Sequence, residues 1–263
     1  MDKNVGEKNR RVLSGIKRVL IYSIAAFMFY LSSACGSVET VKNEPKKRAS
    51  TPLPPAALKV EKPVNVSFST YSKDWPVDWQ WIDPDQKNNP ARYDLKTGGL
   101  RVRIPTGKDL FGNNRTAPRY IKALMGDFQI DTRVKFLPKE NYQGAGLLIY
   151  EDDENYLRLE RAYGGFGGGA EGIRFDLRRG DEFTPIVTPG VMQTDAETVD
   201  LKLIRSGGHF TAYWRPDEHA EWRLVGEVDT DYPETIMAGV DACNTAQEIT
   251  AEFLYIHLLP PAK

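Results

Sequence analysis

The sequence predicts an all-β fold, a sandwich or jelly roll of two antiparallel sheets preceded by an export signal and a flexible linker. Short runs in which apolar and polar residues alternate recur from about residue 66 to residue 259. Clusters of Gly, Pro, Asn and Asp separate these runs, as in Asn88–Pro90 and Ser206–Gly208, and such clusters are typical of tight turns. No segment has the period of an amphipathic helix. Many short strands with this punctuation favour one large β-domain.

The first 34 residues have the pattern of a secretory signal peptide. A basic segment up to Arg18 precedes the apolar run 19–31 and the small residues 32–34, which is the order found in export signals. The apolar run is shorter than the roughly 20 residues that span a bilayer. Cys35 follows directly and resembles the lipidated cysteine of bacterial lipoproteins. We expect lipid on Cys35 to hold the protein to the bacterial cell envelope, on its periplasmic or surface side, with a plain signal peptide or uncleaved anchor as the alternative.

The net charge and the two cysteines indicate what kind of domain is exported. Removal of residues 1–34 takes six basic and two acidic residues from totals of 35 and 36, which leaves a net charge of −5 and gives no indication of nucleic-acid binding. Residues 35–65 are rich in Pro, Lys, Glu and Ala and predict a flexible tether. The sandwich should then span 66–259, with a tail at 260–263. If Cys35 carries lipid, Cys243 has no disulfide partner, and we expect it to be a small buried hydrophobe.

The strands follow in order along the predicted domain. A β-hairpin is expected at 145–161, in which an apolar strand ends at Tyr150 and the polar residues 151–155 make the turn. In its second strand, Leu157 and Leu159 should point into the core, and Tyr156, Arg158 and Glu160 should share the other face. The remaining predicted strands are 100–104, 128–136, 173–178, 199–203, 210–214, 222–228 and 249–258.

Several short motifs, taken in their order and spacing, resemble the DUF1349 family. They are Asp78–Pro84, Asp109–Phe111, Ala117–Arg119, Gly126–Phe128, Ala145–Tyr150 with Asn155–Leu157, and Gly208–Trp214 followed by Trp222–Gly226. That family is similar to the concanavalin A-like (lectin/glucanase) β-sandwiches, which include C-terminal domains of some β-xylosidases. The resemblance covers nearly all of residues 66–259. It implies two stacked antiparallel sheets and a concave face on which relatives often hold sugars.

A polar face is the candidate site. If strand 156–161 lies beside strand 173–178, Tyr156, Arg158 and Glu160 share a face with alternating charged residues of the second strand. That face is either a groove for a hydroxyl-rich ligand, since guanidinium groups donate and carboxylates accept hydrogen bonds, or an exposed sheet surface stabilised by cross-strand ion pairs. The predicted ligand-binding residues are Tyr150, Tyr156, Arg158, Glu160, Arg174, Asp176, His209 and Tyr213.

Three other segments have a structural and a functional interpretation. The acidic residues 151–155 are expected to form a polar turn, although their oxygens also suit calcium; no other metal or cofactor is predicted. The glycine-rich segment 164–169 predicts a hairpin loop, or alternatively a flap carrying Phe166 over a groove. Trp75, Trp79 and Trp81 are expected to complete the core, with a sugar-stacking platform as the alternative.

These observations support three hypotheses of function. The first is a membrane-anchored, exported lectin-like module that binds carbohydrate without catalysis. The second is a glycoside hydrolase that uses Glu160 and Asp176, in which case the two carboxyl groups should lie about 5–10 Å apart across a cleft. The third is a structural or protein-interaction lipoprotein of the cell envelope, whose charged strands only solvate the sheet.

Overall fold

The computed structural model describes residues 57–68, 78–95, 98–165, 168–187 and 192–261. The predicted signal peptide, Cys35, most of the tether, Trp75 and Phe166 lie outside the described residues. By its internal contacts the chain divides into a unit of residues 1–48 and a unit of residues 49–263, and every described residue belongs to the second. No helix in the described part of the chain is long and apolar enough to cross a membrane.

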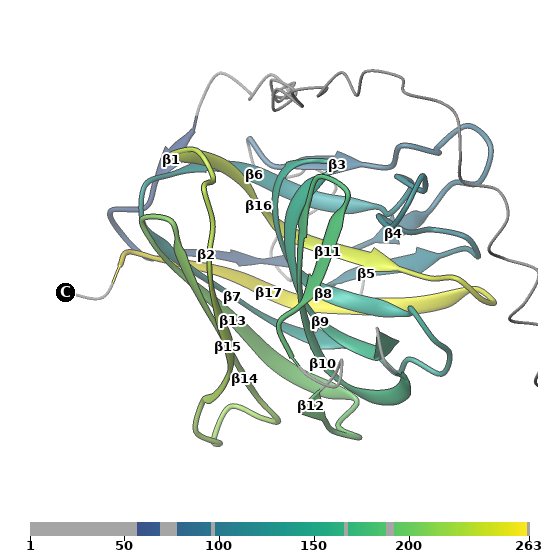
Figure 1. Cartoon of the computed structure of the whole chain (residues 1–263). Helices are drawn as coiled ribbons and strands as arrows, with labels where there is room; N and C mark the ends of the chain where they lie inside the picture. Colours follow the sequence, from purple (N-terminus) through teal and green to yellow (C-terminus); the bar gives the residue numbers. More distant parts are fainter. Residues whose placement is uncertain (1–56, 69–77, 96–97, 166–167, 188–191, 262–263) are drawn as a thin grey trace, which may run out of the picture. The chain divides into compact units, whose positions relative to one another are not determined.

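The described residues form a β-sandwich without an α-helix, as predicted (Figure 1). Its strands are β1 (Leu58–Lys59), β2 (Val64–Ser67), β3 (Gln80–Ile82), β4 (Arg92–Asp94), β5 (Leu100–Ile104), β6 (Arg119–Met125), β7 (Phe128–Lys135), β8 (Gly144–Asp152), β9 (Asn155–Gly165), β10 (Gly168–Arg179), β11 (Glu182–Pro185), β12 (Met192–Gln193), β13 (Thr198–Ser206), β14 (His209–Arg215), β15 (Arg223–Asp229), β16 (Thr235–Cys243) and β17 (Ile249–Leu259).

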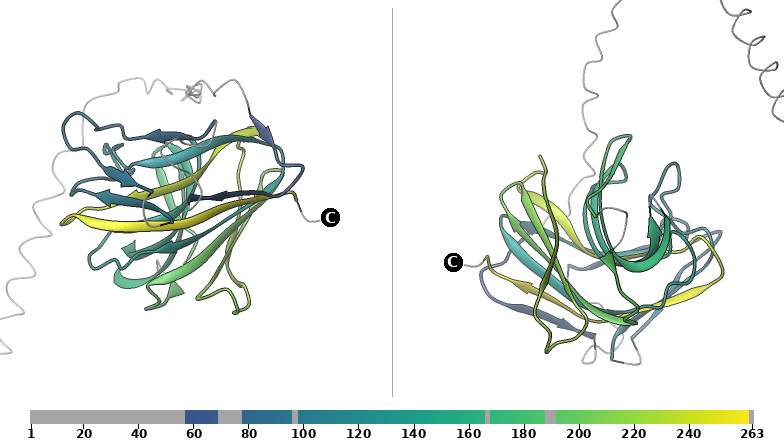
Figure 2. Two further views of the ribbon diagram at one scale, coloured as in Figure 1. Left: turned by 180° about the vertical axis from the view of Figure 1, so that it is seen from behind. Right: turned by 60° about the horizontal axis from the view of Figure 1, so that its bottom comes forward.

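The strands make two sheets, which we call sheet A and sheet B. Sheet A has nine strands in the order β1-β6-β16-β8-β9-β10-β11, with β3 paired to β6 and β12 paired to β10. Sheet B has eight strands in the order β15-β14-β13-β7-β17-β5-β4, with β2 paired to β17. All of these pairs are antiparallel except β1 with β6. The further views show the two layers stacked on each other (Figure 2).

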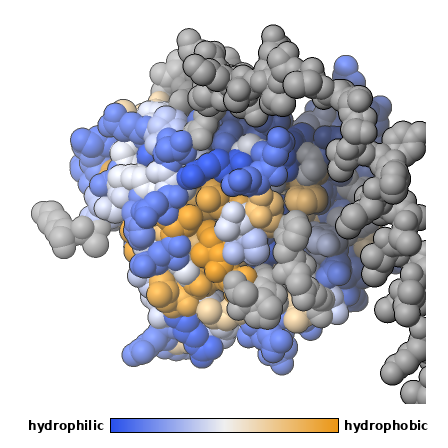
Figure 3. Space-filling view, in the orientation of Figure 1, coloured by the Kyte–Doolittle hydropathy of each residue, from blue (hydrophilic) through white to orange (hydrophobic). Residues whose placement is uncertain are grey.

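The main core lies between the sheets, where alternate residues of each strand point inward. Sheet A contributes Leu159 and Phe175, and sheet B contributes Phe210 and Trp214, all of them buried in one apolar cluster. In the orientation of Figure 1, an apolar area framed by hydrophilic residues lies in the region between β15 and β11 (Figure 3). The core therefore reaches the surface where the edges of the two sheets approach.

Two central strands of sheet A, β6 and β16, were not predicted. In the sequences Arg-Tyr-Ile-Lys-Ala-Leu-Met and Thr-Ile-Met-Ala-Gly-Val-Asp-Ala-Cys, nearly every residue is buried. A strand that is covered on both faces loses the alternation of apolar and polar residues. The element that covers their second face is the segment 105–118, which contributes Leu110 and Ala117 to a second apolar cluster.

The sandwich begins before the predicted boundary at residue 66. Strand β1 pairs with β6, β2 pairs with β17, and Val60 between them is buried. The two strands were not predicted because short edge strands need few apolar side chains, and because this stretch is rich in Pro and Lys. Residues 58–65, which were predicted to belong to the tether, therefore belong to the sandwich.

Candidate functional site

A row of charged side chains crosses the outer face of sheet A, the face turned away from sheet B. Arg119 on β6 lies opposite Asp241 on β16, and Asp241 lies opposite Gly146 on β8. Gly146 in turn lies opposite Glu160 on β9, which pairs with Arg174 on β10. Directly opposed residues in antiparallel strands share a face. The row thus has an arginine at each end, two carboxylates inside them and a glycine in the middle.

The arginines and carboxylates on the β9–β10 side form an ion-pair network. Arg174 donates from Nε and Nη2 to Glu160 Oε2, at 3.1 and 2.5 Å, and its Nε lies 3.0 Å from Asp176 Oδ2. Arg158 lies between the acids, with Nη1 3.5 Å from Asp109 Oδ1 and Nη2 3.9 Å from Asp176 Oδ2. The predicted pairing of the two strands is confirmed.

Of the two alternatives for this charged face, the exposed sheet surface is wrong. Glu160 is 0% exposed and Arg158 is 3% exposed. The segment 105–118 covers much of the face, and Leu110 from it packs with Leu148 and Tyr156 of sheet A. Sequence alternation marks which residues share a face, but it gives no information on whether a distant loop lies over that face.

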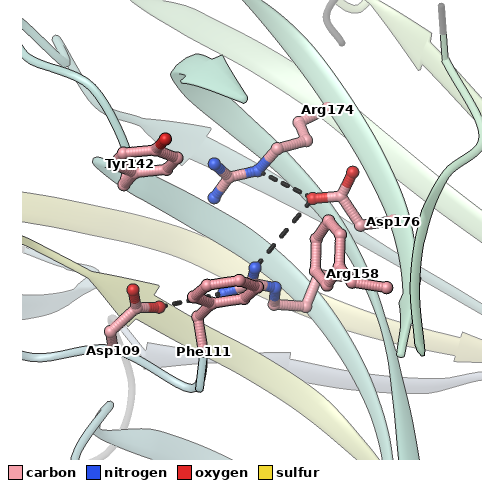
Figure 4. A pocket seen from close by; sticks show the side chains of 7 residues that line it. Asp109, Phe111, Tyr142, Arg158, Arg174 and Asp176 are labelled. Atoms are coloured by element: carbon pink, nitrogen blue, oxygen red, sulfur yellow. Dashed lines mark ion pairs between the residues drawn. The ribbon is translucent and has the colours of Figure 1, made fainter. Parts of the chain in front are cut away.

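A hollow of about 100 Å³, open to solvent on one side, remains beside this cover. Its floor is charged, and its rim is aromatic (Figure 4). The lining residues are Asp109, Phe111, Tyr142, Arg158, Arg174, Asp176 and Phe183. Phe111 and Tyr142 are 43% and 47% exposed, and the rings of Phe111 and Phe183 meet edge to face at 5.5 Å. Two guanidinium groups and two carboxylates are thereby presented beneath rings that a ligand can contact.

Burial and the arginines set the carboxyl pKa values apart. Burial raises the pKa of Asp176 to about 6, although Arg174 and Arg158 oppose the shift. Burial also acts to raise the pKa of Glu160, but the same two arginines outweigh it and lower that pKa below its usual value. Asp241 has no such direct partner, and burial together with the charge of Glu160 raises its pKa well above the usual range. Glu160 therefore stays ionised to a lower pH than Asp176 or Asp241 does.

The structure brings six of the eight predicted site residues to one face, with different roles. Arg158, Arg174 and Asp176 line the hollow, whereas Glu160 lies beneath it and is paired to Arg174. Tyr150 and Tyr156 are buried under the cover and do not line the hollow; Tyr156 Oη donates to the carbonyl oxygen of Leu110 at 2.6 Å, and Tyr150 Oη to Asp153 Oδ1 at 2.7 Å. Tyr156 thereby fixes the cover to the sheet, whereas Tyr150 is bonded to the turn between β8 and β9.

His209 and Tyr213 do not belong to this site. Both lie on β14 in sheet B, and their neighbours Phe210 and Trp214 point into the core. His209 and Tyr213 therefore face outward on the opposite side of the sandwich. His209 Nδ1 lies 2.8 Å from Asp229 Oδ1 at the exposed end of the strand. Their inclusion was an error of sheet assignment, since the residue pattern of a strand does not show which sheet it joins.

Six residues of the site were missed: Asp109, Phe111, Tyr142, Phe183, Asp241 and Cys243. The first three lie in segments between strands, where no periodicity marks a side chain's direction. Asp241 and Cys243 belong to the unpredicted strand β16. Cys243 is buried in the second apolar cluster, as expected, and Arg158 Nη1 also lies 3.2 Å from its Sγ. Burial nonetheless raises the pKa of the Cys243 thiol.

The acidic segment after β8 forms a polar turn, as predicted. Asp152 Oδ1 accepts hydrogen bonds from the amide of Glu154 and from Asn155 Nδ2, both at 2.8 Å. The turn is shorter than expected, because β8 runs to Asp152 and β9 begins at Asn155. Calcium binding by this turn stays a prediction. The tryptophan prediction holds for Trp79, which is buried and stacks on Tyr120 at 4.9 Å.

Solved structures with the same fold include a GH43 protein and a xylosidase. The GH43 protein BlXynB from Bacillus licheniformis has a TM-score of 0.61 and 18% identity, over 74% of this chain and 39% of that chain. The xylan β-1,4-xylosidase from Bacillus halodurans C-125 has a TM-score of 0.59 and 17% identity, over 74% of this chain and 38% of that chain. This chain thus matches less than two fifths of the length of either protein. A functionally unknown protein from Saccharomyces cerevisiae has a TM-score of 0.55 and 14% identity, over 71% of this chain and 98% of that chain.

No curated protein matches the sequence. Residues 66–241 match the family described as the β-xylosidase C-terminal concanavalin A-like domain, GH43_C2. The concanavalin A-like sandwich implied by the sequence motifs is thereby confirmed, while the narrower assignment to DUF1349 stays a prediction. The two stacked antiparallel sheets and the order of the motifs along them agree with this match, which covers most of the chain. This chain therefore belongs to the family of β-xylosidase C-terminal concanavalin A-like domains.

Proposed function

We propose that this domain binds carbohydrate, without catalysis, in the hollow on the outer face of sheet A. The observation that carries the proposal is the charged floor of Arg158, Arg174, Asp109 and Asp176 beneath an aromatic rim. Sugar hydroxyls donate to carboxylates and accept from guanidinium groups. The apolar faces of sugar rings pack on aromatic side chains.

The hollow is small, with a volume of about 100 Å³, below the roughly 300–1,000 Å³ of pockets that enclose small molecules. It therefore suits contact with one part of a saccharide at its open mouth. The floor is preorganised, because Arg174 is held by Glu160 and Asp176 through contacts of 3.1 Å or less. A ligand therefore meets donors whose side-chain entropy is already lost on folding, which favours binding.

A glycan array with the full chain, followed by calorimetry on each glycan bound, tests the proposal. Tyr142→Ala should lower the affinity about twofold to twelvefold, since an aromatic contact is worth about 0.5–1.5 kcal/mol. Tyr93→Ala is the matched control, because Tyr93 is similarly exposed, at 40%, and does not line the hollow. Binding of no glycan, or equal affinity of the Tyr142→Ala and wild-type chains, would contradict the proposal.

Hydrolysis is the second candidate function, and the pKa of Asp176 near 6 favours it. A carboxylic acid with a pKa close to neutrality is suited to general acid catalysis. The predicted partner Glu160 is unsuited to the reaction, because it lies beneath the hollow and is bonded to Arg174. Hydrolysis would instead need Asp109 as the second carboxylate. Release of a chromophore from aryl glycosides, lost in Asp176→Asn, would favour the hydrolase over the binding module.

We also propose that the domain is exported and anchored to the bacterial cell envelope through lipid on Cys35. The support is the sequence alone: a basic segment, a short apolar run and small residues directly before Cys35. In cells fed labelled palmitate, the wild-type protein should carry label and enter the detergent phase on phase separation. Cys35→Ser should abolish both properties, and label retained by Cys35→Ser would refute the anchor.

A further inference from the structure

Beneath the hollow, three potential metal ligands converge at one point of sheet A. The carboxylates of Glu160 and Asp241 and the thiol of Cys243 each offer one atom, and these three atoms lie within 4.8 Å of one another. Each residue is at most 1% exposed. They come from two strands, β9 and β16, which are separated by β8. These three ligands lie apart from the acidic turn 151–155, whose oxygens suit calcium.

The oxygens at this point lack hydrogen-bond donors. Among the described residues, neither carboxylate oxygen of Asp241 has a hydrogen-bond partner, and the same holds for Glu160 Oε1. The other oxygen of Glu160, Oε2, accepts from Arg174. Buried carboxylates are nearly always hydrogen-bonded, paired or bound to a metal. Three unpartnered, buried oxygen atoms beside a sulfur atom therefore offer a set of ligands that suits a cation.

Glycines in β8 create the room in which the three side chains meet. Gly146 lies opposite both Asp241 and Glu160, and Gly144 lies opposite Cys243. A Cβ atom at Gly144 would lie 2.8 Å from Glu160 Oε1, and one at Gly146 would lie 2.6 Å from Glu160 Cα. Any larger residue in β8 would thus fill the space between β9 and β16. The side chains of the outer strands approach each other only because the strand between them has none here.

We propose that Glu160, Asp241 and Cys243 form a buried site for a divalent transition-metal ion, with zinc as the preferred ion. Thiolate and carboxylate ligands in a set of three suit tetrahedral zinc, which would keep one position for a water molecule. The thiolate disfavours calcium and magnesium, which take oxygen ligands. The site lies under the arginines of the hollow, yet the inference does not depend on whether the hollow binds sugar.

Cobalt titration of the full chain, stripped with a chelator, tests the site. We expect one Co²⁺ per chain, with a sulfur-to-cobalt charge-transfer band, and one Zn²⁺ per chain that displaces it, counted by elemental analysis. Cys243→Ser should abolish the charge-transfer band, and Asp241→Asn should weaken Co²⁺ binding at least tenfold. Asp152→Asn, in the acidic turn, is the control and should change neither the band nor the affinity.

Folding of each variant is checked by near-ultraviolet circular dichroism. Asp241→Asn keeps the shape of the side chain, and it supplies the test by affinity if Cys243→Ser does not fold. Absence of bound metal in the wild-type chain would overturn the proposal, as would a charge-transfer band that persists in Cys243→Ser or an affinity unchanged in Asp241→Asn. Sugar binding is measured separately, so that failure of the metal site and failure of the proposed function are distinguishable.

Discussion

Replacing Arg174 by methionine should destabilise the domain by about 3–5 kcal/mol. The guanidinium of Arg174 makes three contacts of 3.1 Å or less with Glu160 and Asp176, and all three residues are at most 3% exposed. Methionine has a similar volume but no charge, so the substitution leaves two buried carboxylates without their main partner. Loss of one member of a buried ion pair costs roughly 3–5 kcal/mol, a large share of the roughly 5–15 kcal/mol by which domains are stable.

The assay is urea denaturation at pH 7 with a chelator present, followed by tryptophan fluorescence. With a slope of about 2 kcal/mol per molar urea, the midpoint should fall by roughly 1.5–2.5 M. Arg179→Met is a matched control on the same strand, because Arg179 pairs with Asp231 at 3.6 Å while the two side chains are 43% and 61% exposed. An exposed pair of this kind contributes about 0–1 kcal/mol.

A double-mutant cycle isolates the interaction. Glu160→Gln combined with Arg174→Met removes both charges of the central pair, so the double variant should be more stable than the sum of the single effects implies, by about 1–3 kcal/mol. If Arg174→Met costs no more than Arg179→Met, or if the cycle shows no coupling, the charge cluster is open to water. The reasoning on the buried floor of the hollow would then be refuted.

Two further predictions test the same face. Burial raises the pKa of Asp176 from 3.8 to about 6, so the folded chain holds this proton more tightly than the unfolded chain. The resulting stability, roughly 3 kcal/mol, is present below pH 4 and is lost as the pH rises through 6. In Asp176→Asn, the free energy of unfolding measured by denaturation between pH 4 and 7 should lack this decrease. Gly146→Ala should destabilise the domain by roughly 3 kcal/mol or more. The new Cβ would lie 2.1 Å from the carbonyl oxygen of Leu159 and 2.6 Å from Glu160 Cα. A thermal unfolding midpoint equal to that of the wild type would show that β8 and β9 are further apart.

The sequence predicted the hairpin and the pairing at the site because those features depend on local pattern. Alternation in 156–161 placed Leu159 in the core and Arg158 and Glu160 on one face, and the register of β9 with β10 then brought Arg174 opposite Glu160. Side chains on a strand alternate with period two whatever the strand packs against. For this reason, the short alternating strands and the face that each residue occupies could be read directly.

Prediction failed where a residue's surroundings come from distant parts of the chain. Strands β6 and β16 lack alternation because the segment 105–118 covers their second face, and the same cover buries the predicted exposed charges. His209 was placed with the site because a strand's sequence does not record which sheet it joins.

The sequence by itself determined the all-β class, the order of most strands and the charged face of the β9–β10 pair. The tertiary structure decided that this face is buried, that Phe111, Tyr142 and Phe183 surround its opening, and that Asp241 meets Glu160 across Gly146. Local patterns follow from the geometry of a single strand, whereas burial and convergence depend on which strands become neighbours and on the loops that cross them. Those contacts join residues far apart in the sequence, so that no local pattern records them.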